Sequence, residues 1–228
     1  PRAGSAGLTT PGPVRISSWL REMVDEGTEY VALEASSHAL AQRRLDGTRM
    51  DVAVFTNLTQ DHLDYHADLD GYRAAKLHLL DLLKPGGWAV VNRDEEAWAG
   101  LSAPSGRTLG YGLADETDRP GRDDPGEGLL LEASNLHLGA DGSRFELRLG
   151  DEEASVDLPL LGHFNVENAL AAAGVAWVAG MSLPEIAGGL ARAPQIRGRL
   201  ERVVDRPVPV LLDYAHTPDA LERVLETL

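Results

Sequence analysis

The sequence predicts an α/β protein in which a mostly parallel β-sheet is flanked by helices. Short apolar runs, typical of buried parallel strands, alternate with stretches that carry apolar residues at helical spacing. Alternation of strand and helix builds a parallel sheet covered by helices. The 228 residues, of which 43% are hydrophobic and 25% charged, suffice for one large domain, or for one domain and part of another.

The first half of the chain supplies most of this alternation. The segment 1–13 is rich in Gly, Pro, Ser and Thr, so we expect a loop there. A helix is predicted to begin after Ser17-Ser18, at Trp19, and to end at Gly27, and another is predicted over 71–83, ending before Pro85-Gly86-Gly87. Three apolar runs are predicted strands: Tyr30–Ala35, Asp51–Leu58 and Trp88–Asn92.

The second half has a different pattern. Residues 115–128 are charged and rich in Pro and Gly, which favours an exposed loop. Alternating segments separated by turn signals such as Asp141-Gly142 predict an antiparallel meander. These segments are Leu129–Leu138, Arg144–Leu149 and Ser155–Leu160.

Helical patterns dominate the last third of the chain. Helices are predicted over Asn165–Ala179 and Leu183–Ala193, the latter with Pro184 in its first turn. A strand over Val208–Leu212 and a helix from Pro218 resemble the opening of another domain. We therefore expect one domain over residues 1–196 and the start of a second, Rossmann-like domain over 197–228.

The composition excludes several classes of function. With 21 Lys and Arg against 36 Asp and Glu, the formal charge is -15, which argues against nucleic-acid binding. The chain has no cysteine, so disulfides and thiolate metal sites are excluded. No apolar stretch approaches the roughly 20 residues that span a bilayer. We therefore expect a cytoplasmic protein that binds neither nucleic acid nor membrane. We also expect it to act as a monomer.

The densest polar cluster directly follows the predicted strand Asp51–Leu58. It runs from Asn57 to His66 and contains Asp61, His62 and Asp64. In open α/β sheets, ligands bind beyond the carboxyl ends of strands. His62 and His66 are four residues apart, so on a helix they would share a face and suggest zinc. The alternative interpretation is a solvated helix start capped by Asp61.

A carboxylate at the end of another predicted strand favours a metal site. Glu34 lies at the end of the predicted strand Tyr30–Ala35, two residues before Ser36-Ser37-His38. A carboxylate buried at a strand end is costly unless it is paired or bound to a cation. Two strand ends that deliver carboxylate and imidazole groups favour Mg²⁺ bound beside a phosphate.

Lys76 stands out because the chain otherwise uses arginine for positive charge. The only lysines are Lys76 and Lys84. A lysine amine can lose its proton and become a nucleophile or be carbamylated, which a guanidinium cannot do. Lys84, before Pro85-Gly86, is better explained as a cation at a helix C-terminus. An ordinary exposed lysine is the alternative interpretation of Lys76.

Two further polar motifs occur at predicted helix starts. Asn165 opens the alanine-rich helix and suits an N-cap, although asparagine also binds adenine edges. The segment from Asp213 to Asp219 follows an apolar strand, and Thr217 with Pro218 suits the start of a helix. Each motif can therefore be interpreted either as the start of a helix or as part of a binding site.

Together these segments resemble the Mur ligase family over nearly the whole chain. The stretches that carry the resemblance are EASSHALAQRRLDG, VFTNLTQDHLDYHADLDGYRAAK, LLGHFNVENALAA and DYAHTPDAL. The resemblance is strongest to the branch that adds the third amino acid, diaminopimelate or lysine, to UDP-MurNAc-L-Ala-D-Glu in peptidoglycan biosynthesis. It implies an ATP- and Mg²⁺-dependent ligase that works through an acyl phosphate, on a central domain related to P-loop NTPases.

The resemblance also implies roles for individual residues. Lys76 matches a lysine that becomes N-carboxylated, and Glu34, His62 and the carbamate of Lys76 match metal ligands. Contacts to the UDP-MurNAc-dipeptide are implied for Thr9, Thr10, Ser36, Gln42 and Arg44. Leu8 stands where the family often has asparagine. Contacts to ATP are implied for Asn165, Asn168, Arg199, Asp213 and His216.

One expected motif does not occur in the sequence. No G-x-x-x-x-G-K-S/T phosphate loop is found, since neither lysine follows a glycine. We therefore expect a fragment that lacks the phosphate-loop strand and is inactive alone. The alternatives are a related amide ligase (folylpolyglutamate synthase or the ligase half of cyanophycin synthetase), a non-catalytic nucleotide-sugar-binding remnant, and a zinc hydrolase using His62 and His66.

Overall fold

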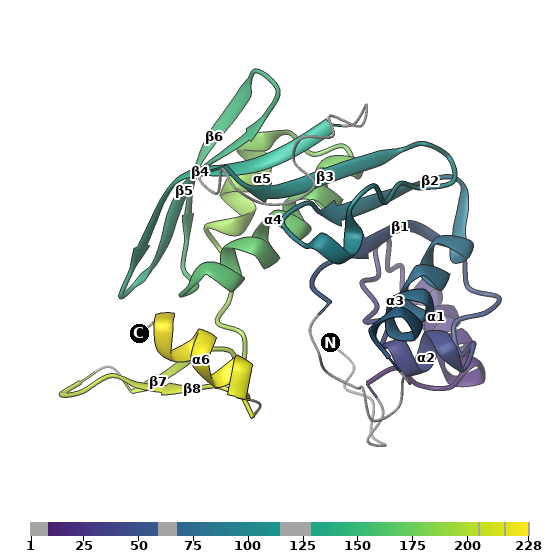
Figure 1. Cartoon of the computed structure of the whole chain (residues 1–228), viewed down its shortest axis with the longest axis horizontal. Helices are drawn as coiled ribbons and strands as arrows, with labels where there is room; N and C mark the ends of the chain where they lie inside the picture. Colours follow the sequence, from purple (N-terminus) through teal and green to yellow (C-terminus); the bar gives the residue numbers. More distant parts are fainter. Residues whose placement is uncertain (1–8, 59–67, 115–128, 205, 217, 228) are drawn as a thin grey trace. The chain divides into compact units, whose positions relative to one another are not determined.

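The computed structural model describes residues 9–58, 68–114, 129–204, 206–216 and 218–227. Six strands form one sheet in the order β1-β2-β3-β4-β5-β6, and β7 and β8 form a separate two-stranded sheet (Figure 1). The chain divides into two compact units. The first holds residues 1–53, 57–89 and 102–107, and the second holds 54–56, 90–101 and 108–228.

The large sheet changes from parallel to antiparallel along its strand order. Backbone hydrogen bonds from Ala89 to Arg107 (3.0 Å) and from Arg93 to Tyr111 (2.8 Å) keep one offset, as parallel strands do. β3 and β4 are parallel, and β4, β5 and β6 form the expected antiparallel meander. The mostly parallel sheet with a meander is thereby confirmed. The strands are β1 (Met50–Phe55), β2 (Leu83–Asn92), β3 (Thr108–Leu113), β4 (Leu129–Gly139), β5 (Gly142–Leu149) and β6 (Glu152–Leu158).

Among its described residues, the first unit has three α-helices and one 3₁₀-helix beside parts of β1 and β2. The helices are α1 (Pro13–Asp25), α2 (Ser37–Ala41), α3 (Leu69–Leu77) and η1 (His78–Leu82). Their apolar faces enclose a core of Ile16, Leu40, Leu45 and Leu82, each at most 4% exposed. The helix predicted over 71–83 is confirmed and continues from α3 into η1. The helix predicted after Ser17-Ser18 is also present, but its predicted start is wrong, because α1 begins at Pro13 and contains both serines.

The predicted strand Tyr30–Ala35 is wrong. These residues adopt no regular secondary structure, and Tyr30 and Val31 are 76% and 47% exposed. A strand forms only when a neighbouring strand pairs with its backbone. In the described part of the chain this segment belongs to neither sheet, so its apolar composition is insufficient to make it a strand.

In the second unit, two helices cover one face of the sheet (Figure 1). α4 (His163–Val178) packs on β3 and β4, and α5 (Leu183–Leu190) packs on β5 and β6. Both predicted helices are confirmed, and Pro184 lies in the first turn of α5 behind a capping box of Ser182 and Glu185. A 3₁₀-helix, η2 (Glu96–Trp98), follows β2.

The chain ends in a small hairpin and a helix. β7 (Glu201–Val204) pairs antiparallel with β8 (Val210–Leu212), and α6 (Pro218–Thr227) follows. The predicted strand near 208–212 and the helix from Pro218 are confirmed, whereas β7 was not predicted. The predicted loop at 115–128 and the Thr217 cap lie outside the described residues. Within the described ranges, no helix has both the length and the apolar character needed to cross a membrane.

Candidate active site around Lys76

Lys76 lies in the last turn of α3, half-buried within the first unit. Burial lowers the pKa of its amine, and the carboxylate of Glu34 acts in the opposite direction by favouring the charged form. The Tyr72 ring lies one turn earlier, with its centroid 5.6 Å from Nζ. A lowered pKa means that more of the amine is neutral and nucleophilic at a given pH. Lys76 and Glu34, two of the three predicted metal ligands, therefore lie in one unit and interact electrostatically.

Thr10 fixes the segment that carries Glu34. Its hydroxyl donates a hydrogen bond to the carbonyl of Glu34 (2.8 Å) and accepts one from the backbone N–H of Ser36 (3.1 Å). Thr10 has no exposed surface. The Ser36 hydroxyl accepts from the backbone of Ala39 (3.3 Å) and so caps α2. These bonds hold residues 34–36 in place although they belong to no strand.

Arg44 and Gln42 extend this network. The Arg44 guanidinium donates from Nη1 to the carbonyl of Thr10 (2.9 Å) and from Nε to Oε1 of Gln42 (2.9 Å). Thr9, the neighbour of Thr10, is exposed. The five residues that sequence reasoning linked to the dipeptide substrate therefore gather in one unit, although residues 9 and 44 are far apart in the chain.

Part of the predicted metal site falls outside the described residues. His62 and His66, on which the zinc alternative rests, lie there, together with Asp61 and Asp64. In the described ranges, no three His, Cys, Asp or Glu side chains gather closely enough to hold a metal ion. Glu34 and Lys76 are therefore the described members of the predicted ligand set.

Asn165 and Asn168 lie in the first half of α4, in the second unit. The predicted N-cap role of Asn165 is wrong, because Gly162 is the N-cap residue, with a φ of 87°. Asn165 is instead 1% exposed and donates from Nδ2 to the carbonyl of Leu161 (2.8 Å). Asn168 is exposed one turn further on.

Asp213 ties the end of β8 to the start of β7. One carboxylate oxygen accepts from the backbone N–H of Leu200 (2.8 Å) and the other from that of Ala215 (2.7 Å). The exposed Arg199 precedes Leu200. His216 is also exposed, and its Nδ1 lies 2.9 Å from the carbonyl of Tyr214. The Asp213 carboxylate therefore holds the backbone next to Arg199 and next to His216.

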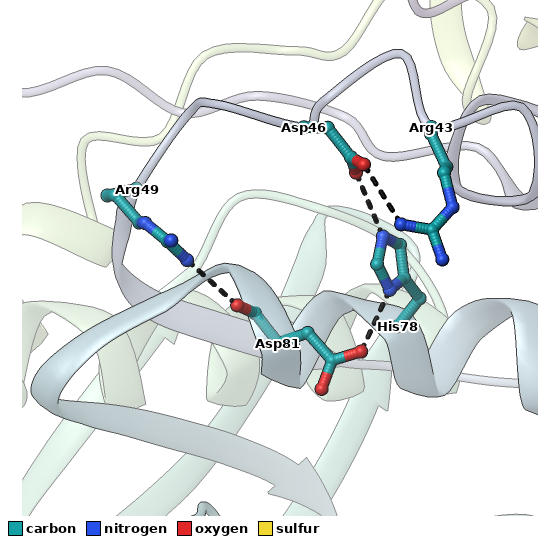
Figure 2. A network of polar contacts seen from close by, with 5 residues as sticks. All are labelled: Arg43, Asp46, Arg49, His78 and Asp81. Carbon is teal, nitrogen blue, oxygen red and sulfur yellow. Dashed lines mark hydrogen bonds and ion pairs between the residues drawn. The ribbon is translucent and has the colours of Figure 1, made fainter.

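Sequence reasoning missed a histidine, two residues after Lys76, that lies between two carboxylates; Figure 2 shows this histidine, His78, with Asp46 and Asp81. Nε2 of His78 lies 3.0 Å from Oδ1 of Asp46, and its Nδ1 lies 2.9 Å from Oδ2 of Asp81. The three-residue spacing of His78 and Asp81 on a helix is a signal that the sequence contains. Asp46, from a distant loop, has no such signal.

The fold and the site define an α/β protein that holds a half-buried lysine beside a carboxylate. A family model described as the Mur ligase middle domain matches residues 2–176. The chain belongs to the Mur ligase family.

Relatives with established names match almost the whole chain. A UDP-N-acetylmuramoyl-L-alanyl-D-glutamate--2,6-diaminopimelate ligase from Xylella fastidiosa (strain 9a5c) is 44% identical over 228 residues, covering 97% of this chain and 44% of the relative. A ligase of the same name from Geobacter sulfurreducens is 42% identical over 228 residues, covering 96% and 42%. The chain therefore spans less than half the length of these relatives.

A solved structure supports the same assignment. The structure of a UDP-N-acetylmuramoyl-L-alanyl-D-glutamate--2,6-diaminopimelate ligase superimposes with a TM-score of 0.77 at 34% identity. The match covers 96% of this chain and 44% of the solved one. The expected family and fold class are thereby confirmed.

Proposed function

We propose that this chain is the central part of an ATP-dependent ligase that adds diaminopimelate to UDP-MurNAc-L-Ala-D-Glu in peptidoglycan biosynthesis. The names of the relatives favour diaminopimelate over lysine as the incoming amino acid. Residues 1–196 form the central domain in this proposal, and 197–228 begin the next one. The reaction consumes ATP and a nucleotide-linked substrate, so we assign it to the cytoplasm. We further propose that the protein acts as a monomer.

The observation that carries the proposal is the environment of Lys76. Because burial lowers the pKa of this amine, a larger fraction is neutral and able to attack CO₂. The amine nitrogen forms a bond to the carbon of CO₂ and releases one proton, which leaves a carbamate. The side chain thereby changes from a cation to an anion on the same stem.

The donor set around Lys76 fits a hard divalent cation. Glu34 interacts electrostatically with Lys76, and after carbamylation both side chains present anionic oxygen atoms. Glu34, His62 and the carbamate of Lys76 would hold Mg²⁺, which neutralises charge on phosphoryl oxygens during transfer from ATP. An unmodified Lys76 would instead repel the cation, so the carbamate is required for this fit.

The other residues bind and orient the two substrates in this proposal. Thr9, Ser36, Gln42 and Arg44 hold the UDP-MurNAc-dipeptide, with Arg44 supplying positive charge. Thr10 acts mainly by fixing the segment of Glu34 and Ser36, because its buried hydroxyl already donates and accepts a hydrogen bond. Residues of the second unit contact ATP, namely Asn165, Asn168, Arg199, Asp213 and His216.

The proposed reaction has two steps. The γ-phosphoryl group of ATP is transferred to a substrate carboxylate, which gives an acyl phosphate and ADP. The amino group of diaminopimelate then attacks the acyl carbon, and the tetrahedral intermediate expels inorganic phosphate to form the amide. The chain contributes by positioning and by charge, as is general for phosphoryl transfer.

Carbon-13 NMR with labelled bicarbonate tests the modification directly. The Lys84→Arg variant leaves Lys76 as the only lysine and preserves a cation opposite Asp51, with which Lys84 pairs at 2.8 Å. We expect a lysine carbamate resonance in this variant and in the unsubstituted chain, but not in Lys76→Arg. A carbamate at the N-terminal amine would persist in all three. A resonance equal in Lys76→Arg and in the unsubstituted chain would contradict the assignment.

A phosphate-release assay tests the expectation for the chain alone. Because the sequence has no G-x-x-x-x-G-K-S/T loop to hold the ATP phosphates, we expect no turnover with UDP-MurNAc-L-Ala-D-Glu and diaminopimelate. Measurable phosphate release that depends on both substrates would show that this expectation is mistaken.

A further inference from the structure

His78 joins two segments of the first unit through a pair of carboxylates. Asp46 comes from the loop between α2 and β1, 32 residues away, and Asp81 comes from η1 itself (Figure 2). Because both ring nitrogens face carboxylate oxygens, both must carry a proton to satisfy the two contacts. The His78 side chain is only 19% exposed. We call His78, Asp46 and Asp81 the His78 clamp.

Two arginines make further contacts with the two aspartates of the clamp. Nη1 of Arg43 lies 3.1 Å from Oδ2 of Asp46, so this carboxylate accepts from both His78 and Arg43. Nη1 of Arg49 donates to the backbone carbonyl of Asp81 (3.0 Å). The loop between α2 and β1 therefore reaches the α3–η1 junction at two points. Charge-assisted hydrogen bonds of this kind are stronger than neutral ones.

The position of the clamp on the helix relates it to Lys76. His78 follows the last residue of α3 and lies two residues after Lys76. Two residues correspond to about 200° of rotation around a helix axis, so the two side chains point to roughly opposite sides. Holding His78 against the loop therefore fixes the rotation of the end of α3. Lys76 is half-buried, and the carboxylate of Glu34 favours its charged form.

The clamped loop also carries residues of the proposed substrate site. Arg44 and Gln42 lie within four residues of Asp46, and Arg44 donates to the backbone of Thr10 (2.9 Å). Thr10 in turn holds the carbonyl of Glu34 (2.8 Å). The backbone of residues 44–46 thus joins two sets of polar contacts, one to the end of α3 and one to the segment of Glu34.

We propose that the His78 clamp is a positioning device that fixes the rotation of α3 so that Lys76 stays half-buried and faces Glu34. This inference rests on the proposed role of Lys76 as a carbamylated residue. His78 does not touch the reacting atoms in this proposal. It acts through Lys76 and is a positioning residue.

The Asp46→Asn variant separates positioning from direct electrostatics. Removing a negative charge near an amine would, by itself, lower the pKa of Lys76 further or leave it unchanged. Loss of the clamp has the opposite effect, because a lysine that rotates toward solvent regains an ordinary, higher pKa. The sign of the change therefore distinguishes the two explanations.

Trace labelling with acetic anhydride, read by mass spectrometry over a range of pH, measures the pKa of each lysine. Lys84 serves as an internal reference because it is the only other lysine. We expect the pKa of Lys76 to rise in Asp46→Asn by about half a unit or more, which lowers the neutral fraction and the carbamate occupancy about threefold. The matched control is Asp25→Asn, which breaks the exposed pair of Asp25 with Arg21 on α1 and leaves Lys76 unchanged.

Two substitutions of His78 provide a second test if Asp46→Asn does not fold. Glutamine carries both of its N–H donors on one nitrogen, beside an acceptor oxygen, so it cannot place a donor where each ring nitrogen of His78 stands, whereas the guanidinium of arginine carries donors on three nitrogens. We expect His78→Gln to lose the Lys76 carbamate and His78→Arg to retain it, with both folded by circular dichroism. Equal carbamate occupancy in the two variants would overturn the proposal.

The outcomes also separate this inference from the proposed function. A carbamate at Lys76 that persists unchanged in folded Asp46→Asn would overturn the clamp and leave the proposed function intact. If Lys76 of the unsubstituted chain carries no carbamate and titrates like Lys84, the proposed role of Lys76 fails and the clamp with it.

Discussion

Replacing Gly174 by alanine should destabilise the protein, although helix propensity alone predicts the reverse. Gly174 lies inside α4 where this helix meets the sheet. A Cβ at this position would lie 2.8 Å from Cγ1 of Val90 and 3.3 Å from Cδ2 of Leu109. Both contacts are shorter than the roughly 3.5–4.0 Å at which carbon atoms pack. Val90 and Leu109 are fully buried, so neither can move aside freely.

Two opposing terms set the size of the effect. Alanine gains about 1 kcal/mol over glycine in a helix interior. Overpacking a well-filled core costs about 1–3 kcal/mol. We therefore expect Gly174→Ala to lower the free energy of unfolding by about 1 kcal/mol, which lowers Tm by about 3 °C in a protein of this size.

Gly189 provides the matched control. It lies in α5, and a Cβ there would meet no atom within 4 Å. Gly189→Ala should therefore show the propensity gain alone and raise Tm by about 3 °C. Thermal denaturation followed by circular dichroism measures both variants. If Gly174→Ala raises Tm as Gly189→Ala does, the close approach of α4 to β2 and β3 does not limit the side chain at this position.

Three further substitutions test individual polar groups. Asp213→Asn should cost about 1.5–3 kcal/mol of stability, since one of its two bonds to backbone N–H groups is lost, and hydrogen exchange at those amides should accelerate. Ser37→Ala should raise the free energy of unfolding by about 1 kcal/mol, because the buried hydroxyl has no hydrogen-bond partner in the described part of the chain; a loss of stability in urea denaturation would count against this. The carboxylates of Asp46 and Asp81 raise the pKa of His78, so its contribution to stability is complete below about pH 6.5 and is lost as pH rises through the raised value. The Tm difference between the unsubstituted chain and His78→Gln should accordingly shrink at high pH, and a constant difference would refute this.

The turn and strands of the antiparallel meander could be predicted because short stretches of sequence specify them. The turn between β4 and β5 was predicted at Asp141-Gly142. Gly142 has a φ of 148°, and a Cβ there would lie 2.4 Å from the carbonyl oxygen of Leu158. Only glycine fits such a position, so the residue type reports the backbone geometry directly.

β3 was not predicted because its glycines disfavour a strand. Gly112 is required by a contact that the sequence does not reveal. A Cβ at this position would lie 2.7 Å from the carboxylate of Asp94, which accepts a hydrogen bond from the backbone N–H of Leu113 (2.7 Å). Tertiary contact therefore overrides strand propensity here. The opposite error, at Tyr30–Ala35, arose because apolar composition does not tell whether a pairing strand is present.

The proposed active site was only partly accessible to sequence reasoning. Lys76 was singled out because the chain has only two lysines, and the resemblance to Mur ligases supplied Glu34 as its neighbour. The depression of the Lys76 pKa by burial is a property of the fold and has no local signal. The contact of His78 with Asp46 crosses 32 residues and likewise depends on how α3 packs beside α2.

Resemblance to a family identifies the residues of a site without separating those that touch substrate from those that hold the site together. Thr9 and Thr10 were assigned the same role, yet Thr9 is exposed whereas Thr10 is fully buried. The Thr10 hydroxyl is already engaged as donor and acceptor, and its carbonyl accepts from Arg44. A substrate can reach Thr9 without rearrangement, whereas it can reach the Thr10 hydroxyl only by breaking bonds that position Glu34. The Thr10→Val substitution should therefore disturb the environment of Lys76 even without substrate, and Thr9→Val should not.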